Sequence, residues 1–466
     1  MQAKKNKRDI IIEYEQGSLV IDGWNDSYQK YCQELVFDQR TLQHRAPAYC
    51  YRDLITGLME DKISYQDRAR KYEMIDSSLI KEIDPRSHQS QALQAWEDAG
   101  YRGLVSLPTG AGKTILAVLC IAKLGRSTLV IVPTIDLLNQ WRKVLQNFFK
   151  FDIGGYGGGE KNLESVTVAT YDSARLIIEA YGNKFGFLVF DECHHLPAPF
   201  YQNIAYASLA PYRIGLSATL ERADGGESVL FKLLGPLVYE EEIKDMAHGG
   251  VLAPYDVVQL EVELSSLERE KYEKQRAVYL SFIKKNGINF SHADGWKQFI
   301  IRSSRSEEGR KAMIAFREQK RLAQAASGKM QKVWELINAH GNEAAIVFTD
   351  DNAMAYLLGK AFILPVLTHK TKAKERKRML DAFRKGELKV LVTSKVLNEG
   401  VDVPEARVGV VVSESGAVRE HVQRLGRILR HSPGKRAVLY ELVSKNTSEQ
   451  SVNIRRRQHS AYQRSH

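Results

Sequence analysis

The feature that most constrains this 466-residue chain is the segment LPTGAGKT at residues 107–114. A short apolar strand candidate at residues 103–106 precedes it, and the apolar helical run ILAVLCIA follows it. Glycines at a strand-to-helix turn let backbone N–H groups wrap phosphates, and the helix N-terminus adds positive potential. The segment therefore predicts a phosphate-binding loop in an α/β domain. The strict pattern has glycine at its first position, where this chain has Leu107.

The loop predicts ATP and Mg²⁺ as ligands. Lys113 is expected to hold the β- and γ-phosphates, and Thr114 to donate its hydroxyl oxygen to Mg²⁺. The other loop residues would line the nucleotide: Thr109, Gly110, Ala111 and Gly112.

A second chemical motif is the strand-like run FLVFDECHH at residues 187–195. Its apolar part ends at Asp191 and Glu192, so both carboxylates are expected at the carboxyl edge of a parallel sheet, where such folds bind ligands. Mg²⁺ accepts a carboxylate together with substrate phosphates, which suits Asp191. Glu192 can act as general base toward the attacking water. His194 is expected to take part in coupling between domains. The alternatives are a surface histidine without a specific role and a metal ligand.

Two blocks of short apolar strands alternate with amphipathic helices, at about residues 100–240 and 343–443. This alternation predicts two parallel sheets covered by helices on both faces. The opening IIIEYEQGSLVIDG resembles a β-hairpin. The expected division is a first domain at 1–80, an α/β domain at 81–242, a second α/β domain at 243–448 with a long helical insertion at about 267–332, and a basic tail at 449–466.

The charge balance favours a polyanionic partner. Lysine and arginine number 67, against 56 aspartate and glutamate, so the formal net charge is +11. Cations and aromatics are interleaved at residues 267–337, a combination that tracks a nucleic-acid backbone and stacks on bases. The alternatives are a solvated helix face for the cations and a core of the helical insertion for the aromatics. The candidate contacts are Lys284, Lys285, Arg302 and Arg305.

Other sequence features point to an intracellular protein of the cytoplasm or nucleoid. The chain has no run of roughly 18 apolar residues and no secretory signal. Its four cysteines show no CxxC spacing, which indicates plain thiols rather than a zinc ribbon or disulfides. No membrane partner is expected.

The loop and the DECH segment together resemble superfamily 2 helicases, which have two RecA-like domains, and further segments resemble that family's motifs in order. DPRSHQSQAL (84–93) is similar to the Q-motif, which makes Gln89 the adenine reader and Arg86 its supporter. VPTIDLLNQW (132–141) and ATYDSA (169–174) are similar to motifs Ia and Ib, with Thr134 and Thr170 as phosphate contacts. LSATL (216–220) is similar to motif III, and assigns Ser217 and Thr219 to coupling.

The second block resembles the remaining helicase motifs. IVFTDD (346–351) is similar to motif IV, and TSKVLNEGVDVPEA (393–406) to motif V, with Gly400 and Asp402 near ATP and Thr393 near the strand. QRLGRILR (423–430) is similar to motif VI, headed by Gln423. Arg427 and Arg430 are three apart and share a helix face. The resemblance implies that they reach the γ-phosphate and supply charge to the transition state.

The segments DECHHLPA, GLSATLERADG and REHVQRLGRILR, followed by VLYELVS, resemble those of XPB-type DNA helicases, particularly compact archaeal ones. The resemblance implies 3′-to-5′ movement and work in nucleotide excision repair or promoter opening. It makes residues 1–80 an N-terminal DNA-interaction domain, residues 81–242 and 243–448 the two RecA-like motor domains, and residues 267–332 a basic thumb of the second. Forked, bubble or damaged DNA would be the substrate, a nuclease or repair protein a partner, and the monomer the default state.

One departure concerns the family's Arg-Glu-Asp motif. Here the matching residues are Arg222, Ala223 and Asp224, which puts strand separation in doubt but not ATP hydrolysis. The alternative is that this loop tolerates alanine and strand separation is unaffected. The alternatives are a duplex-DNA translocase that does not separate strands, an RNA helicase, a restriction-type motor subunit, and a DNA-binding scaffold that does not hydrolyse ATP.

Overall fold

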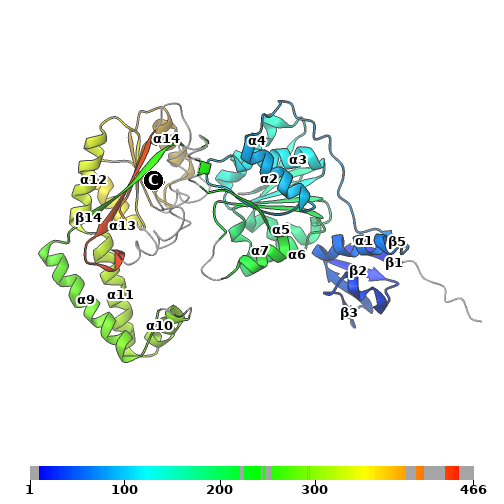
Figure 1. Cartoon of the computed structure of the whole chain (residues 1–466), viewed down its shortest axis with the longest axis horizontal. Helices are drawn as coiled ribbons and strands as arrows, with labels where there is room; N and C mark the ends of the chain where they lie inside the picture. The colour runs from blue at the N-terminus through cyan, green and yellow to red at the C-terminus, as the bar shows by residue number, and fades with distance from the viewer. Residues whose placement is uncertain are drawn as a thin grey trace, which may run out of the picture. The chain divides into compact units, whose positions relative to one another are not determined.

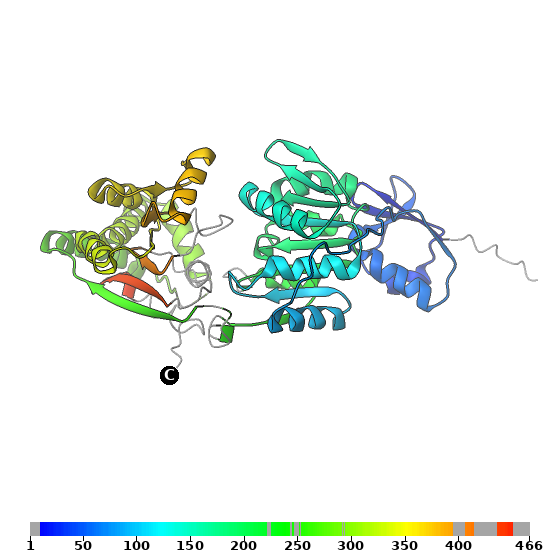
Figure 2. The same cartoon turned by 90° about the horizontal axis from the view of Figure 1, so that it is seen from above.

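The computed structural model describes residues 10–220, 225–242, 245–246, 251, 253–290, 292, 294–394, 406–413 and 436–450. These residues form two compact units that divide between Glu242 and Ile243. Each unit contains its own parallel sheet (Figures 1 and 2). No helix within the described ranges is long and apolar enough to cross a lipid bilayer.

The first unit begins with a small domain built on a five-stranded sheet of order β3-β4-β2-β1-β5. The predicted hairpin is confirmed: β1 and β2 pair antiparallel through a turn whose two residues, Gln16 and Gly17, have φ of 47° and 82°. Helix α1 packs its Leu54 and Leu58 into the sheet's core. The elements are β1 (Ile10–Glu15), β2 (Ser18–Asp22), η1 (Asp26–Tyr31), β3 (Val36–Asp38), β4 (Gln43–Pro47), η2 (Ala48–Cys50), α1 (Tyr51–Glu60) and β5 (Tyr65–Asp67).

The larger part of the first unit is an eight-stranded sheet of order β13-β6-β12-β11-β7-β10-β8-β9. All neighbours pair parallel except the hairpin β8–β9. Helices α2 to α4 and α5 to α7 form two groups on opposite sides of the sheet (Figure 1). The strands are β6 (Arg102–Ser106), β7 (Thr128–Val132), β8 (Ile153–Gly157), β9 (Glu160–Asn162), β10 (Val166–Thr170), β11 (Phe187–Asp191), β12 (Tyr212–Ser217) and β13 (Leu237–Glu240). The helices are α2 (Ser87–Asp98), α3 (Lys113–Leu124), α4 (Ile135–Phe148), α5 (Tyr171–Tyr181), η3 (Cys193–His195), α6 (Pro199–Tyr206) and α7 (Glu227–Leu234).

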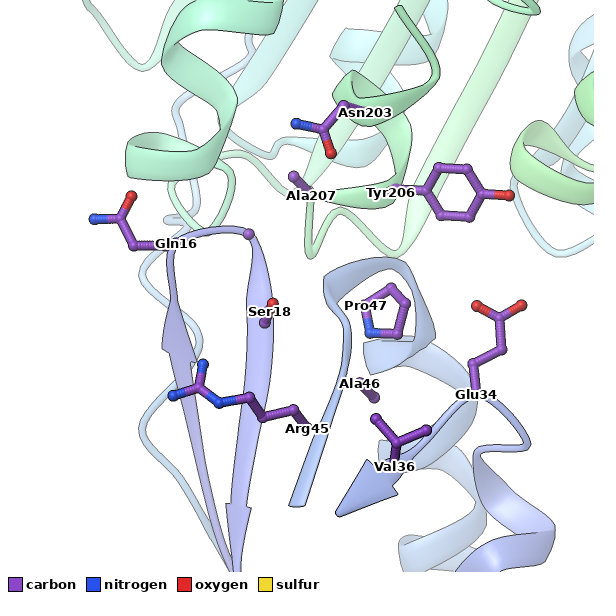
Figure 3. Close-up of a pocket in the computed structure, with 11 residues that line it drawn as sticks. Gln16, Ser18, Glu34, Val36, Arg45, Ala46, Pro47, Asn203, Tyr206 and Ala207 are labelled. Carbon is purple, nitrogen blue, oxygen red and sulfur yellow. The ribbon is translucent and has the colours of Figure 1, made fainter. Parts of the chain in front are cut away.

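The small domain is fixed to this larger part by polar and steric contacts. The Tyr14 hydroxyl lies 2.8 Å from the carbonyl oxygens of Ile178 and Ala207. A Cβ at Gly17 would lie 2.7 Å from that of Ala207, so this turn requires glycine. Beside these contacts, residues of both parts line a cavity of about 410 Å³, among them Arg45 and Tyr206 (Figure 3).

Tyr14→Phe is expected to lower the free energy of unfolding of the first unit by about 1–3 kcal/mol, because buried carbonyl oxygens lose a hydroxyl donor. Burial raises the pKa of the Tyr14 phenol, so the hydroxyl remains a donor even in alkaline solution. Urea unfolding of the full chain measures the change. An unchanged midpoint would mean that water satisfies these carbonyl oxygens.

The second unit is built on a six-stranded, all-parallel sheet of order β14-β19-β18-β15-β17-β16. The strands are β14 (Tyr255–Val262), β15 (Ala345–Phe348), β16 (Val366–Leu367), β17 (Val390–Thr393), β18 (Val408–Val411) and β19 (Ala437–Ser444). Helices α12 (Ser327–His340), α13 (Asn352–Phe362) and α14 (Ala373–Arg384) accompany them. The two sheets confirm the predicted fold class of two parallel-sheet α/β domains.

A helical projection, the predicted thumb, leaves the second unit after β14 (Figure 1). It consists of α9 (Ser266–Lys285), α10 (Gly295–Ser304) and α11 (Glu307–Gln324), and α9 packs along α11. Phe282 and Phe299 are buried in its small core. Helix α12 starts within the range expected for the thumb but packs Val333 into the core of the sheet.

Candidate functional site

The glycine loop joins β6 to α3 at the carboxyl edge of the first unit's large sheet. Gly110 and Gly112 have φ of 89° and 86°, a left-handed conformation that glycine adopts without strain. A Cβ at Gly112 would lie 2.4 Å from the Gln89 side-chain nitrogen, so any other residue there would push the Gln89 amide away from the loop. The neighbouring strand in the sheet, β12, holds the start of the loop: the Leu107 N–H donates to the Ser217 carbonyl at 2.9 Å.

Side chains of the loop offer donors suited to a polyphosphate. Lys113 is the first residue of α3, and its Nζ donates to the Leu107 carbonyl at 3.0 Å. The Thr109 hydroxyl is buried and has no hydrogen-bond partner among the residues that the structure describes. Thr114 follows in the first helical turn. A lysine, the buried Thr109 hydroxyl and two glycines without a Cβ atom fit the phosphates of ATP.

Helix α2 closes the loop from the other side. The Gln89 side chain accepts from the Arg86 N–H at 2.9 Å and donates to the Gly112 carbonyl at 3.2 Å. His88 Nε2 lies 2.8 Å from the Ala111 carbonyl oxygen. The Gln89 amide is therefore engaged with the protein at both its oxygen and its nitrogen, whereas the Arg86 side chain is exposed.

The two carboxylates of DECH lie at the end of β11, the strand beside β12. Asp191 is 6% exposed. Burial raises its pKa, as does the nearby charge of Glu192, while the ammonium of Lys113 lowers it. Trp141 on α4 donates its indole N–H to Asp191 Oδ2 at 2.8 Å. A buried carboxylate next to the phosphate loop is the ligand type that Mg²⁺ takes together with phosphate oxygens.

Glu192 begins a chain of polar contacts that runs to the SAT segment. Its φ of 48° is unusual for a residue other than glycine and marks a constrained backbone. Glu192 Oε2 lies 3.4 Å from His194 Nδ1, which lies 3.0 Å from the Ser217 hydroxyl. Ser217 in turn donates to the Thr219 carbonyl at 2.6 Å. The structure thus brings together the predicted base and the predicted coupling residues.

The predicted nucleic-acid contacts of the first unit start two helices. Thr134 is the N-cap of α4 and accepts from the Leu137 N–H at 3.2 Å. Thr170 is the N-cap of α5 and accepts from the Ser173 N–H at 3.3 Å. Both helices follow parallel strands that are neighbours, β7 and β10, so the two helix starts share one edge of the sheet.

The predicted contacts of the second unit differ in exposure. Thr393 is fully buried, and its hydroxyl donates to the Ser394 carbonyl at 2.9 Å. Lys284 and Arg305 are exposed on the thumb, whereas Lys285 forms an ion pair with Glu308 at 2.8 Å. The Arg302 side chain donates to the Asn286 carbonyl.

Several expected site residues lie outside the described residues: Arg222, Asp224, Gly400, Asp402, Gln423, Arg427 and Arg430.

Two contacts of the site were not predicted from the sequence. One is the Trp141 indole on Asp191. The other is the Tyr171 hydroxyl, which donates to the carbonyl oxygens of Asp191 and Glu192 at 3.1 and 3.4 Å. Both aromatics stand in the segments assigned to motifs Ia and Ib, but only the tertiary fold shows where their polar groups point.

Three protein families match successive parts of the chain. Residues 12–69 match the Xeroderma pigmentosum group B helicase damage recognition domain. Residues 82–222 match the family described as Type III restriction enzyme, res subunit. Residues 310–464 match the ERCC3/RAD25/XPB C-terminal helicase.

Individual relatives cover most of the chain. It is 37% identical over 453 residues to the DNA 3′-5′ translocase XPB2 of Sulfurisphaera tokodaii, which covers 96% of this chain and 100% of that protein. It is 32% identical over 391 residues to a DNA 3′-5′ helicase XPB of Kineococcus radiotolerans, covering 81% of this chain and 63% of that one. The match to the Schizosaccharomyces pombe general transcription and DNA repair factor IIH helicase/translocase subunit XPB has 27% identity and covers 82% of this chain and 46% of that one.

A solved structure supports the fold. The Hef helicase domain of Pyrococcus furiosus matches with a TM-score of 0.51 at 18% identity, over 80% of this chain and 98% of that one.

Proposed function

The chain belongs to the XPB family of DNA 3′-5′ helicases and translocases, and we propose that it is an ATP-driven motor that moves 3′ to 5′ along DNA. The observation that carries the proposal is the site in the first unit. There Asp191 is buried at the end of β11, near enough to the phosphate-loop lysine Lys113 to interact with its charge, and Glu192 follows it directly. That arrangement is suited to hydrolysing a nucleoside triphosphate.

The chain's own residues divide the hydrolysis between them. Lys113, the loop N–H groups and the Thr109 hydroxyl hold the phosphates. Thr114 and Asp191 would hold Mg²⁺, which neutralises charge on the phosphate oxygens when bound. Glu192 orients the attacking water and accepts its proton. Arg427 and Arg430 are assigned to the γ-phosphate by resemblance alone.

The DNA-facing roles rest on position and charge. Thr134 and Thr170 start α4 and α5 at one sheet edge, and the thumb presents Lys284 and Arg305 to solvent. If several phosphates are neutralised, the logarithm of affinity falls with the logarithm of salt concentration, by about 0.7–0.9 per contact. We assign the small domain at residues 10–67 to recognition of DNA structure, and the whole chain to DNA repair.

ATP hydrolysis and strand separation, measured in parallel on forked DNA, duplex DNA and RNA, test the proposal. We expect forked DNA to stimulate hydrolysis, RNA to stimulate it less, and unwinding to require a 3′ tail. Hydrolysis that no nucleic acid stimulates would contradict the assignment.

A second candidate is a translocase that pumps duplex DNA without separating strands. Two observations favour it: Ala223 replaces the central acidic residue of the Arg-Glu-Asp motif, and the relative matched over its full length is named a translocase. Stimulated hydrolysis without unwinding would support this candidate, and restored unwinding in Ala223→Glu would assign the difference to that residue.

A further inference from the structure

Helix α4 connects a predicted DNA contact to the ATP site. Thr134 caps its start, and Trp141 lies seven residues later, about two turns along the same face. Trp141 is 1% exposed and belongs to the apolar face that α4 packs on the sheet, together with Leu138 and Leu145. Its indole N–H donates to Asp191 Oδ2 at 2.8 Å. One rigid helix therefore carries both the cap residue and a hydrogen-bond donor to the buried carboxylate.

Helix α5 repeats this connection with the neighbouring backbone. Tyr171 directly follows the cap residue Thr170 and is 2% exposed. Its hydroxyl lies 3.1 Å from the Asp191 carbonyl oxygen and 3.4 Å from that of Glu192. The peptide that it supports includes Glu192, whose φ of 48° needs the surrounding structure to hold it.

The two aromatic side chains meet the carboxylate pair from different directions. Trp141 holds the side chain of Asp191, and Tyr171 holds the backbone that aims Glu192. An indole N–H can only donate, and it has one hydrogen. Because packed interiors transmit small displacements rather than absorb them, a shift of α4 or α5 moves these two donors against the carboxylates.

We propose that Trp141 and Tyr171 are positioning residues through which DNA contact at the starts of α4 and α5 aligns Asp191 and Glu192 for ATP hydrolysis. The inference rests on the proposed function, since it takes α4 and α5 as DNA-contacting helices. It adds two residues that the helicase motifs leave without a role, and it places the coupling inside the first unit.

The test uses the full chain with two conservative variants, Trp141→Phe and Tyr171→Phe. Each keeps an aromatic ring and removes the donor. Trp96→Phe is the matched control for the first, because Trp96 is equally buried in the same unit but donates to the Arg213 carbonyl at 2.9 Å. Tyr14→Phe is the control for the second, because its hydroxyl contacts the opposite end of α5, at Ile178.

The measurement is the affinity for a fluorescent, slowly hydrolysed ATP analogue with Mg²⁺, in the absence and presence of saturating forked DNA. The ratio of the two dissociation constants gives the coupling between the sites, typically about 5- to 150-fold where sites are coupled. We expect the ratio in each variant to move at least about threefold toward one, while both controls keep the wild-type ratio. DNA stimulation of ATP hydrolysis should fall in parallel.

A wild-type ratio and wild-type DNA stimulation in both variants would overturn the inference and leave the proposed function standing. Equal weakening of nucleotide binding with and without DNA would mean that the contacts are only structural, and would also overturn it. A wild-type protein with neither coupling nor DNA-stimulated hydrolysis would overturn the proposed function itself. If the Trp141→Phe variant does not fold, the result for Tyr171→Phe alone decides the test. That substitution removes a single oxygen atom and so disturbs the packing least.

Discussion

Glu192→Gln is expected to slow DNA-stimulated ATP hydrolysis by about 10²–10⁴-fold, the usual contribution of a general base, while nucleotide affinity stays within about twofold of wild type. Glutamine has the same shape as glutamate but cannot take the proton of the attacking water. The side chain is 13% exposed and lies beside His194, so the substitution keeps the packing of the site. Single-turnover hydrolysis and analogue binding measure the two quantities separately.

Two further variants sharpen this prediction. Lys113→Ala should weaken nucleotide binding as well as hydrolysis, because the lysine is expected to contact the phosphates directly. Glu60→Gln removes an exposed carboxylate of the same unit and should change neither quantity. Hydrolysis by Glu192→Gln within about tenfold of wild type would remove the general-base role from Glu192.

The motor sheets could be predicted because their strands are continuous apolar segments. Apolar strands were expected in the blocks at about residues 100–240 and 343–443, and the fully buried strands β7 and β15 lie in these two blocks. Fully buried parallel strands bear such runs, and the turns that follow them carry the chemical motifs. The loop, DECH and SAT segments meet at one edge for the same reason, although the roles of their residues stay predictions.

Other parts of the fold depend on contacts between residues that are far apart in the sequence. Strand β14 pairs with β19, so that Tyr255 lies opposite Ala437, and nothing local in either segment specifies that partner. The thumb aromatics divide in a way that composition cannot show: Tyr272 and Phe299 are buried, whereas Phe290 and Trp296 are 41% and 46% exposed. The hydrogen bonds of Trp141 and Tyr171 to Asp191 could not be predicted either. Each joins residues about 20 to 50 positions apart in the sequence, which are close in space only because of the order of the strands in the sheet.

Lys329→Met is expected to lower the free energy of unfolding of the second unit by about 3–5 kcal/mol. Lys329 is fully buried, and its Nζ donates at 2.8 Å to the Val412 carbonyl and to Glu449 Oε2. Burial lowers the pKa of the lysine, and the charge of Glu449 together with its hydrogen bond offsets part of that effect. Methionine keeps the apolar stem but leaves the carboxylate of Glu449 without its counter-charge. Urea unfolding and hydrogen exchange in α12 and β19 measure the loss.

Two further variants show whether the loss in free energy of unfolding comes from leaving a charge unpaired in the protein interior. The double variant Lys329→Met with Glu449→Gln should recover part of the loss, because no buried charge is then left unpaired. Lys445→Met breaks an exposed pair with Glu263, whose side chains are 44% and 69% exposed, and should cost at most about 1 kcal/mol. Equal losses in Lys329→Met and Lys445→Met would contradict the argument, since it attributes the cost to desolvation of the remaining charge.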